Sequence, residues 1–368
     1  MQVRWIVAFG LAAGVGLIAV PVLRLLALDV GLVDSPGPTK VHARDIPYLG
    51  GVAIAGATLA GWLLEPRLGT RIAVVALAGI GVALVGLVDD HRTLGPFFRL
   101  AVEAGAAGAV MIAGVRAEPF GIQALDIAVT LVWIVGVTNA LNLFDNMDGL
   151  AAGTAGVIAG GVFALAAIGG QEVVATVGAA LAGACAGFLV HNWRPASIFM
   201  GDAGSLFLGF VLSIAVLELR PELSLPWSVA VPILLLALPV LDTSMVTIAR
   251  IRHGRRVMTG GKDHLSHRLV ALGVSPPVAV AALIGVEGVL TTLAVACGSG
   301  AVPLWVGVAL GVAVLAGLAG VVLRARVYQE PVVGIWSRVR RTSGRVVSDE
   351  GDLRPAALAA AGHDGLDQ

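Results

Sequence analysis

The chain has 368 residues, of which 57% are hydrophobic and 13% are Asp, Glu, Lys or Arg, and its mean hydropathy is +0.92. An ordinary soluble domain carries about twice that share of charged residues, so the composition excludes a water-soluble fold of this size. The formal net charge is zero, and nothing in the sequence points to a nucleic-acid partner. The composition therefore predicts a protein of the lipid bilayer.

The apolar residues form continuous runs without the alternation of strands, which predicts an all-α polytopic transmembrane bundle. A bilayer core of roughly 30 Å needs about 20 apolar residues in a helix. We expect about eleven spans, with about ten as the alternative, because the second run is short and Gly169 and Gly170 make only a tight break. The expected spans are residues 5–28, 49–65, 71–88, 97–115, 125–142, 150–169, 172–191, 204–220, 227–249, 276–298 and 303–323.

The Lys and Arg residues gather in alternate loops of this arrangement, and such loops are cytoplasmic in most membrane proteins. The N-terminus is then outside the cell and the C-terminus is inside. We divide the chain into an integral-membrane domain, residues 1–324, and a cytoplasmic tail, residues 325–368. The composition of the tail predicts partial disorder.

Polar residues gather at the cytoplasmic ends of the expected spans. The first cytoplasmic loop contains three prolines and offers Lys40 as a cationic donor, although ordinary positive-inside charge also explains this residue. The third span ends in Asp89 and Asp90, which stay ionised together only beside a cation or basic neighbours. This pair could bind a metal or take a proton from a phosphate, or it is a solvated helix end. Arg99 could contact a lipid phosphate, or it snorkels to the interface.

The sharpest cluster is a series of amides and carboxylates at every third position, Asn139, Asn142, Asp145 and Asp148. That spacing predicts that all of them lie along one helix face. Such groups at the end of an apolar span are costly unless they serve a ligand or an ion. Gly149 then permits a turn.

Two later cytoplasmic loops add further polar groups. Asp202 stands just before the eighth span, where it either caps the helix or faces a phosphate through a bridging Mg²⁺. The basic loop 250–275 contains His264 and His267, followed by Arg268. Two histidines without a third ligand indicate zinc only weakly, whereas a basic loop of this kind suits a diphosphate. A surface basic loop without a ligand is the alternative.

Carboxylates with Mg²⁺, together with Arg, Lys and His, are the groups that phosphoryl transfer needs. Their place at the membrane boundary predicts a substrate with a membrane tail, such as a lipid phosphate. A transporter would instead place ionisable groups near the middle of the membrane. Here Glu103 and Glu287 are the main residues of that kind, so the pattern favours an enzyme at the interface. A structural scaffold would leave the amide and carboxylate series unexplained.

Together these motifs resemble the polyprenyl-phosphate N-acetylhexosamine-1-phosphate transferases, of the glycosyltransferase family 4 type. They follow the family's order between about residues 34 and 270, and five matches in order are far more specific than any one. The matching pieces are Asp34-x-Pro36, Lys40-x-His42, Pro47-x-x-Gly50-Gly51, Asp89-Asp90, Asn139-x-x-Asn142-x-x-Asp145-x-x-Asp148-Gly149, Asn192, Pro195-Ala196, Phe199-Met-Gly201-Asp202-x-Gly204-Ser205 and His264-x-x-His267-Arg268.

The resemblance implies that a UDP-N-acetylhexosamine gives its sugar 1-phosphate to undecaprenyl phosphate at the cytoplasmic face of a bacterial plasma membrane. UMP is released, with Mg²⁺ as cofactor, for which Mn²⁺ could substitute. By position, the resemblance implies catalytic roles for Asp89, Asp90, Asp145 and Asp148, substrate binding by Lys40, Arg99, Asn192, His264, His267 and Arg268, and metal binding by Asn142 and Asp202. The base stays open, and direct attack by an ionised lipid phosphate is the alternative.

The histidine motif also bears on the branch of the family. The branch that acts on UDP-MurNAc-pentapeptide typically has consecutive histidines there, whereas this chain has Leu265 and Ser266 between its two. The chain therefore looks more like the branch that uses UDP-GlcNAc and starts a cell-envelope polysaccharide, such as O-antigen, teichoic acid or arabinogalactan. The pentapeptide transferase is the alternative, and both the sugar and a homodimeric state stay open.

Overall fold

Helices make up almost all of the secondary structure in the part of the chain that the computed structural model describes, residues 2–34, 45–67, 69–219, 229–258, 260–325 and 327–328. Two short strands, β1 (Val33–Asp34) and β2 (Ile46–Pro47), pair antiparallel after the first helix. The helices, in chain order, are α1 (Gln2–Asp29), α2 (Gly50–Trp62), α3 (Thr70–His91), α4 (Pro96–Ile112), α5 (Gln123–Phe144), α6 (Leu150–Ile168), α7 (Glu172–Asn192), α8 (Gly201–Leu217), α9 (Ala230–Leu235), α10 (Ala237–Arg252), α11 (Leu265–Ala271), α12 (Pro276–Gly298) and α13 (Leu304–Val322).

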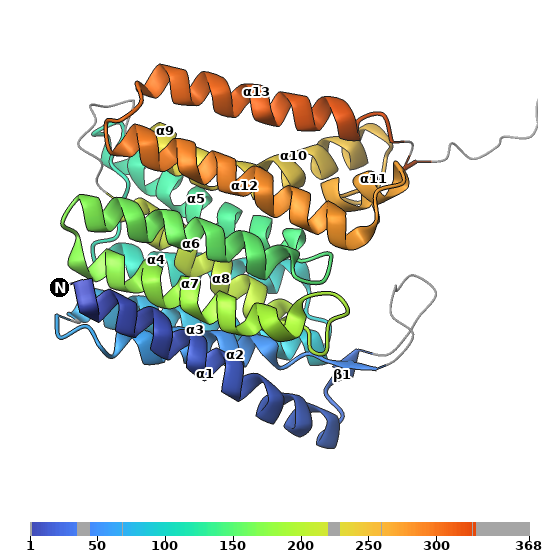
Figure 1. Ribbon diagram of the computed structural model, residues 1–368, viewed down its shortest axis with the longest axis horizontal. Coiled ribbons are helices and arrows are strands. Elements are labelled where there is room, and N and C mark those ends of the chain that lie inside the picture. The colour runs from blue at the N-terminus through green and yellow to red at the C-terminus, as the bar shows by residue number, and fades with distance from the viewer. Residues whose placement is uncertain are drawn as a thin grey trace, which may run out of the picture. The chain divides into compact units, whose positions relative to one another are not determined.

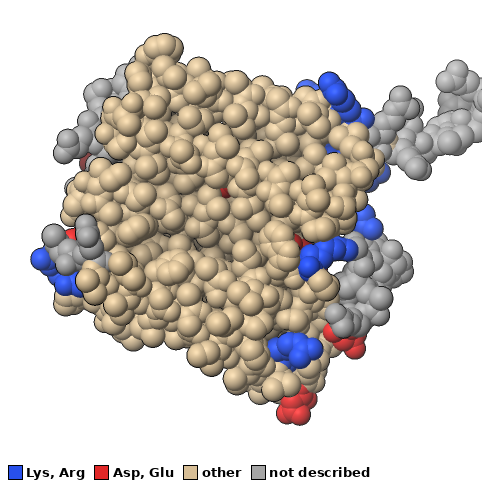
Figure 2. All heavy atoms as spheres, viewed as in Figure 1, with Lys and Arg blue, Asp and Glu red and all other residues tan. Residues whose placement is uncertain are grey.

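The long helices run side by side in roughly one direction (Figure 1). Among the described residues, seven helices are long and apolar enough to cross a membrane, namely α1 from Val3 onward, α3, α5, α6, α7, α12 and α13. Figure 2 shows a broad surface almost free of charged side chains between two ends where Asp, Glu, Lys and Arg gather. The predicted helical, multi-span class is therefore confirmed, whereas the number of spans and their orientation stay predictions.

The most buried helix is α8, which packs against α2, α3 and α5. Glycines let these neighbours approach closely. A Cβ on Gly86 of α3 would lie 2.6 Å from the main chain of Asp202 and Ala203, and a Cβ on Gly204 would lie 2.8 Å from the Cα of Gly51. Because real Cβ atoms do not come that close, the start of α8 can reach α3 only where these side chains are absent. This approach positions the polar cluster described below.

The ninth expected span, 227–249, is wrong as a continuous helix, because the chain breaks at Leu236 between α9 and α10. Pro239 explains the break. A proline has no main-chain N–H, so the carbonyl of Leu235 four residues earlier loses its helical donor. The break leaves α10 as a separate element with a buried acidic residue, Asp242, near its middle.

The division at residue 324 stays a prediction, since most of the proposed tail lies outside the described residues. The tight break predicted at Gly169 and Gly170 is confirmed. There α6 ends at Ile168 and α7 begins at Glu172, and Gly170 has a φ of 68°. A positive φ of this size favours glycine, which explains why the chain can reverse in so few residues.

Candidate active site

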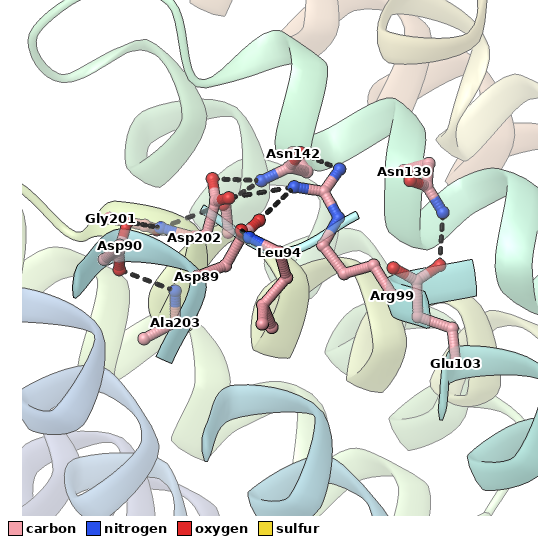
Figure 3. A network of polar contacts seen from close by, with 11 residues as sticks. Asp89, Asp90, Leu94, Arg99, Glu103, Asn139, Asn142, Gly201, Asp202 and Ala203 are labelled. Atoms are coloured by element: carbon pink, nitrogen blue, oxygen red, sulfur yellow. Dashed lines mark hydrogen bonds and ion pairs between the residues drawn. The ribbon is translucent and has the colours of Figure 1, made fainter. Parts of the chain in front are cut away.

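Asp90 in the last turn of α3 binds the beginning of α8 (Figure 3). Its carboxylate accepts hydrogen bonds from the main-chain N–H of Asp202, at 2.9 Å, and of Ala203, at 3.3 Å. Negative charge is favourable at this position, because the first N–H groups of a helix lack partners within the helix. The helix that corresponds to the eighth expected span, α8, thus begins at Gly201 rather than at residue 204. Asp202 lies inside α8 and its side chain is available for other partners.

Asp89 faces Arg99 at the start of α4. One oxygen, Oδ1, accepts the main-chain N–H of Leu94, and the other, Oδ2, lies 2.7 Å from Nη1 of Arg99. The Asp89 side chain is 8% exposed and that of Arg99 is 19% exposed. Hydrogen bonds between charged groups are the strong ones, and little water competes here. This pair therefore holds the short connection between α3 and α4 in one conformation.

The guanidinium of Arg99 also reaches α5 and α8. Its Nη1 lies 2.9 Å from Oδ2 of Asp202, and its Nη2 lies 3.4 Å from Oδ1 of Asn142. The amide nitrogen of Asn142 donates to Oδ1 of Asp202, at 2.8 Å, and to the hydroxyl of Ser205, at 2.9 Å. The two predicted metal-binding residues, Asn142 and Asp202, are therefore neighbours. Together with Asp89 they direct oxygen atoms at the Arg99 guanidinium, as Figure 3 shows.

A second pair lies one helical turn further along the same two helices. Glu103 of α4 is 2% exposed and accepts a hydrogen bond from the amide of Asn139 of α5. Its Oε1 is buried without a hydrogen-bond partner among the described residues. Sequence reasoning noted Glu103 only as an exception within a span. The signal was available, because Glu103 and Asn139 each stand one turn from a predicted site residue, Arg99 and Asn142.

The prediction that Asn139, Asn142, Asp145 and Asp148 share one helix face is wrong for the last two. The helix α5 ends at Phe144, and Asp145 leaves the helical region with a ψ of 63°. The two aspartates instead belong to the turn before α6, which begins after Gly149 with a φ of 80°. The spacing of the polar residues does not mark where the helix ends, so the sequence pattern could not decide between a helix and a turn.

Asp145 lies among other carboxylates. Burial and, to a smaller extent, the negative charges of Asp202, Asp90 and Asp148 together raise the pKa of Asp145 to about 8. These charges act at short range in a partly buried environment, so the turn after α5 lies near the network on α3 and α8. The structure thus brings the predicted carboxylates to one end of the bundle. Their individual catalytic roles stay predictions.

Asn192, at the end of α7, ties two stretches of main chain together. Its Oδ1 accepts the N–H of Gly149 at 2.9 Å, and its Nδ2 donates to the carbonyl of Ile198 at 2.9 Å. Asp148 makes a similar contact, since its Oδ2 accepts the N–H of Ala196 at 3.2 Å. Asn192 is 3% exposed, and both ends of its amide have main-chain partners. Its expected contact with the sugar nucleotide stays a prediction.

Asp242 holds the histidine motif in place, and sequence reasoning missed it. This carboxylate on α10 is fully buried and accepts hydrogen bonds from Nδ1 of His264, at 2.7 Å, and from the N–H of Leu265, at 2.6 Å. Asp242 thus caps α11 and orients the imidazole. A single acid within an otherwise apolar run, three residues after Pro239, was the available signal.

The rest of the basic loop is held by a buried ion pair. Arg250 donates to both carboxylate oxygens of Asp263, at 2.8 and 2.7 Å, and Arg268 donates to the main-chain carbonyl of Asp263, at 2.8 Å. Burial and, to a smaller extent, the neighbouring His264 and Lys262 together lower the pKa of His267 to about 4. His267 is therefore neutral at pH 7 in the ligand-free protein.

A hydrogen bond from Ser266 to Asn146 joins this loop to the turn after α5. The histidine motif and the carboxylate network thus lie at the same end of the helices. Lys40, the remaining predicted substrate ligand, lies outside the described residues. The predicted site residues that the structure describes are therefore contributed by α3, α4, α5, the turn between α5 and α6, α7, α8, and α11 with the residue before it.

Comparison with known proteins decides the family. The model of glycosyl transferase family 4 matches residues 72–220, which include Asp89, Arg99, Asn142 and Asp202. The chain is also 33% identical over 285 residues to the probable undecaprenyl-phosphate N-acetylglucosaminyl 1-phosphate transferase of Bacillus subtilis, an alignment that covers 74% of this chain and 79% of that protein. The chain belongs to glycosyl transferase family 4.

Other relatives from this family differ in how much of the chain they match. The decaprenyl-phosphate N-acetylglucosaminephosphotransferase of Mycolicibacterium smegmatis is 31% identical over 69% of the chain and 72% of its own length. The phospho-N-acetylmuramoyl-pentapeptide-transferase of Moorella thermoacetica is 38% identical, over 56% of the chain and 72% of its own length. The two transferases for N-acetylglucosamine thus align over more of this family 4 chain than the pentapeptide transferase does.

Proposed function

We propose that this chain transfers N-acetylglucosamine 1-phosphate from UDP-N-acetylglucosamine to undecaprenyl phosphate and releases UMP. An oxygen of the lipid phosphate attacks the phosphorus that bears the sugar. The bond from that phosphorus to the bridging oxygen breaks, and the oxygen leaves with UMP. The product is a lipid-linked sugar diphosphate, the starting unit of a cell-envelope polysaccharide.

The observation that carries this proposal is the meeting of Asp89, Arg99, Asn142 and Asp202 in one network near the membrane boundary. Phosphoryl transfer depends on positioning and on charge stabilisation, and this network supplies both signs of charge. The histidine motif at the same end of the bundle adds donors for a diphosphate. A transporter would not need this combination, and membership in family 4 argues against one.

The donor set fits a magnesium ion. Asn142 and Asp202 offer amide and carboxylate oxygens, with Asp89 beside them, and hard oxygen ligands are those that Mg²⁺ prefers. The same oxygens surround the Arg99 guanidinium, so the site is built for positive charge. When bound there, Mg²⁺ would neutralise charge on the diphosphate as it develops in the transition state.

The other roles in the reaction, positioning and phosphate binding, are assigned to side chains of this chain. Asp90 is taken up by the N–H groups of α8, so we assign it the positioning of Asp202. Asp89 adds a further oxygen ligand for the cation beside Arg99, and the imidazole of His264, oriented by Asp242, faces the diphosphate. The reaction then needs no separate base, since the acceptor phosphate is already ionised near pH 7 (its second pKa is about 6).

The family resemblance keeps one competing substrate in view, UDP-MurNAc-pentapeptide. Two observations favour the smaller sugar: the histidines are separated by Leu265 and Ser266, and the relatives for N-acetylglucosamine align over more of the chain. We also propose eleven spans, with the broken α9–α10 pair as the ninth and the site on the cytoplasmic face of the plasma membrane.

The deciding experiment uses the purified full-length protein with Mg²⁺, undecaprenyl phosphate and one UDP-sugar at a time. We expect UMP release with UDP-N-acetylglucosamine, and little with UDP-MurNAc-pentapeptide or UDP-glucose. Omission of undecaprenyl phosphate is the control for simple hydrolysis. Release with the pentapeptide alone would assign the other branch, and a folded preparation that releases no UMP with any UDP-N-acetylhexosamine would refute the enzyme.

A further inference from the structure

The Arg99 guanidinium occupies the position of a cation among oxygen ligands. It contacts Oδ2 of Asp89, Oδ2 of Asp202 and Oδ1 of Asn142 at 2.7, 2.9 and 3.4 Å. Among the described residues, His, Cys, Asp and Glu form no group of three or more that could hold a metal ion. The oxygens of Asp89, Asn142 and Asp202 that would suit a metal ion are instead hydrogen-bonded to the singly charged Arg99 guanidinium.

A divalent cation and this guanidinium cannot share these oxygens. Magnesium needs its ligands at about 2.0–2.1 Å in near-octahedral geometry, which leaves no room for an N–H group at hydrogen-bond distance on the same lone pairs. The two positive charges would also repel one another at short range. Arg99 must therefore leave at least Asp202 when the cation enters, and it needs another acceptor.

The position and the burial of Glu103 make it the acceptor for the displaced Arg99 guanidinium. It follows Arg99 by four residues on α4, so the two side chains lie on the same face of the helix. Its Oε2 binds Asn139, while its Oε1 is buried without a hydrogen-bond partner among the described residues. An unpaired buried carboxylate oxygen is costly, and a guanidinium that turned toward it would remove that cost.

We propose that Arg99 is the exchangeable counterion of the metal-free site, and that Glu103 is a positioning residue that receives the guanidinium when a divalent cation binds. The proposal rests on the proposed function only in that a cation binds between Asp89, Asn142 and Asp202. Asn139 contributes to the same exchange, because its hydrogen bond orients the Glu103 carboxylate. The exchange keeps the network electrically balanced with and without the metal.

The test measures Mn²⁺ binding to the purified full-length protein in detergent without substrates, by the electron paramagnetic resonance signal of free Mn²⁺. Arg99→Met removes the competing cation, so its dissociation constant for Mn²⁺ should fall about tenfold. Glu103→Gln removes the acceptor, so its dissociation constant should rise about fivefold. Glu287→Gln is the matched control, since Glu287 is also buried with an unpartnered oxygen but lies on α12. It should bind Mn²⁺ as the wild type does.

The double variant Arg99→Met/Glu103→Gln separates exchange from a simple charge effect. Without a guanidinium to receive, loss of Glu103 should leave the affinity of the Arg99→Met protein unchanged. If Glu103→Gln weakens Mn²⁺ binding equally with and without Arg99, Glu103 acts on the metal directly and the proposal is overturned. It is equally overturned if Arg99→Met fails to strengthen binding, including the case in which neither protein binds Mn²⁺.

Melting of each metal-free variant is recorded to verify folding. If Glu103→Gln does not fold, Glu103→Asp replaces it, because that change keeps the charge and shortens the reach. It should weaken Mn²⁺ binding only when Arg99 is present, and the opposite result counts against the exchange. Release of UMP is measured separately, so a protein with the expected Mn²⁺ pattern and no UMP release would refute the proposed function and leave the counterion exchange standing.

Discussion

At the scale of single residues, the site depends on which partner each carboxylate takes. Asp90 binds main-chain N–H groups, Asp89 binds Arg99, and Asp202 binds Arg99 and Asn142. Three aspartates of similar appearance in the sequence thus have different tasks.

Asp202→Asn should lower the rate of UMP release at limiting Mg²⁺ by about 100-fold, because it removes the charge that would bind the metal. The amide keeps the shape of the side chain, so folding should be preserved. Ser205→Ala is the control, since Ser205 hydrogen-bonds to Asn142 and to the carbonyl of Gly201 in its own helix, and it should change the rate far less. A near-wild-type rate for Asp202→Asn would show that the metal binds elsewhere.

The ligand-free protein should lose thermal stability as the pH falls from about 6.5 to about 4, in part through His267. Its pKa is lowered to about 4 in the folded protein and returns to about 6.5 on unfolding, so the unfolded state binds more protons in this window. Stability from this residue is therefore present above the unfolded value and lost as the pH falls.

Melting temperatures of wild type and His267→Gln across this range measure the contribution of His267. The variant, which cannot take up the proton, should lose less stability than the wild type. Parallel curves for the two proteins would contradict the lowered pKa of this histidine.

At the scale of elements, the break between α9 and α10 matters most. Because Pro239 ends α9, the separate helix α10 brings Asp242 beneath α11 and orients His264. The cap also binds the N–H of Leu265, so one carboxylate sets both the start of α11 and the direction of the imidazole. The single acid in the apolar helix α10, Asp242, therefore holds the histidine motif in place.

Asp242→Asn should lower kcat/KM for UDP-N-acetylglucosamine by about tenfold to a hundredfold, because a hydrogen bond with a charged group contributes about 1.5–3 kcal/mol. The loss should appear mainly in KM for the sugar nucleotide, since Asp242 acts through His264. Thr243→Val is the control at the next position. Loss of kcat alone, with KM unchanged, would contradict a role in positioning the diphosphate ligand.

At the scale of the whole molecule, charged residues lie at the two ends of the surface in Figure 2, with an apolar band between them. The site and the basic loop share one end. Such an arrangement suits an enzyme that takes one substrate from water and the other from the bilayer.

The proposed orientation predicts which loops a reagent reaches from outside the cell. In a background in which Cys185 and Cys297 are replaced by Ala, Ser299→Cys should react with a membrane-impermeant maleimide in intact cells. Arg252→Cys should react only after permeabilisation. Both positions are exposed in the structure, so burial does not explain a difference. Labelling of both from outside, or the reverse pattern, would contradict the eleven-span orientation.

The helical membrane class, most helix boundaries to within a few residues and the residues of the polar motifs could be predicted from the sequence. These are local properties, because hydropathy, glycine and proline act within one segment. Two of the sequence-based predictions were wrong. Pro239 breaks the ninth expected helix, and α5 ends before Asp145 and Asp148, which their spacing did not reveal.

Which of these residues contact one another depends on how the helices pack. Asp90 and Arg99 contact Asp202 across 112 and 103 positions of sequence, and the contacts require the close approach of α3 to α8 at Gly86. The roles of Asp242 and Glu103 likewise depend on contacts with residues outside their own helices. Whether a buried acid finds a partner depends on the neighbouring helix, and no pattern within its own segment contains that information.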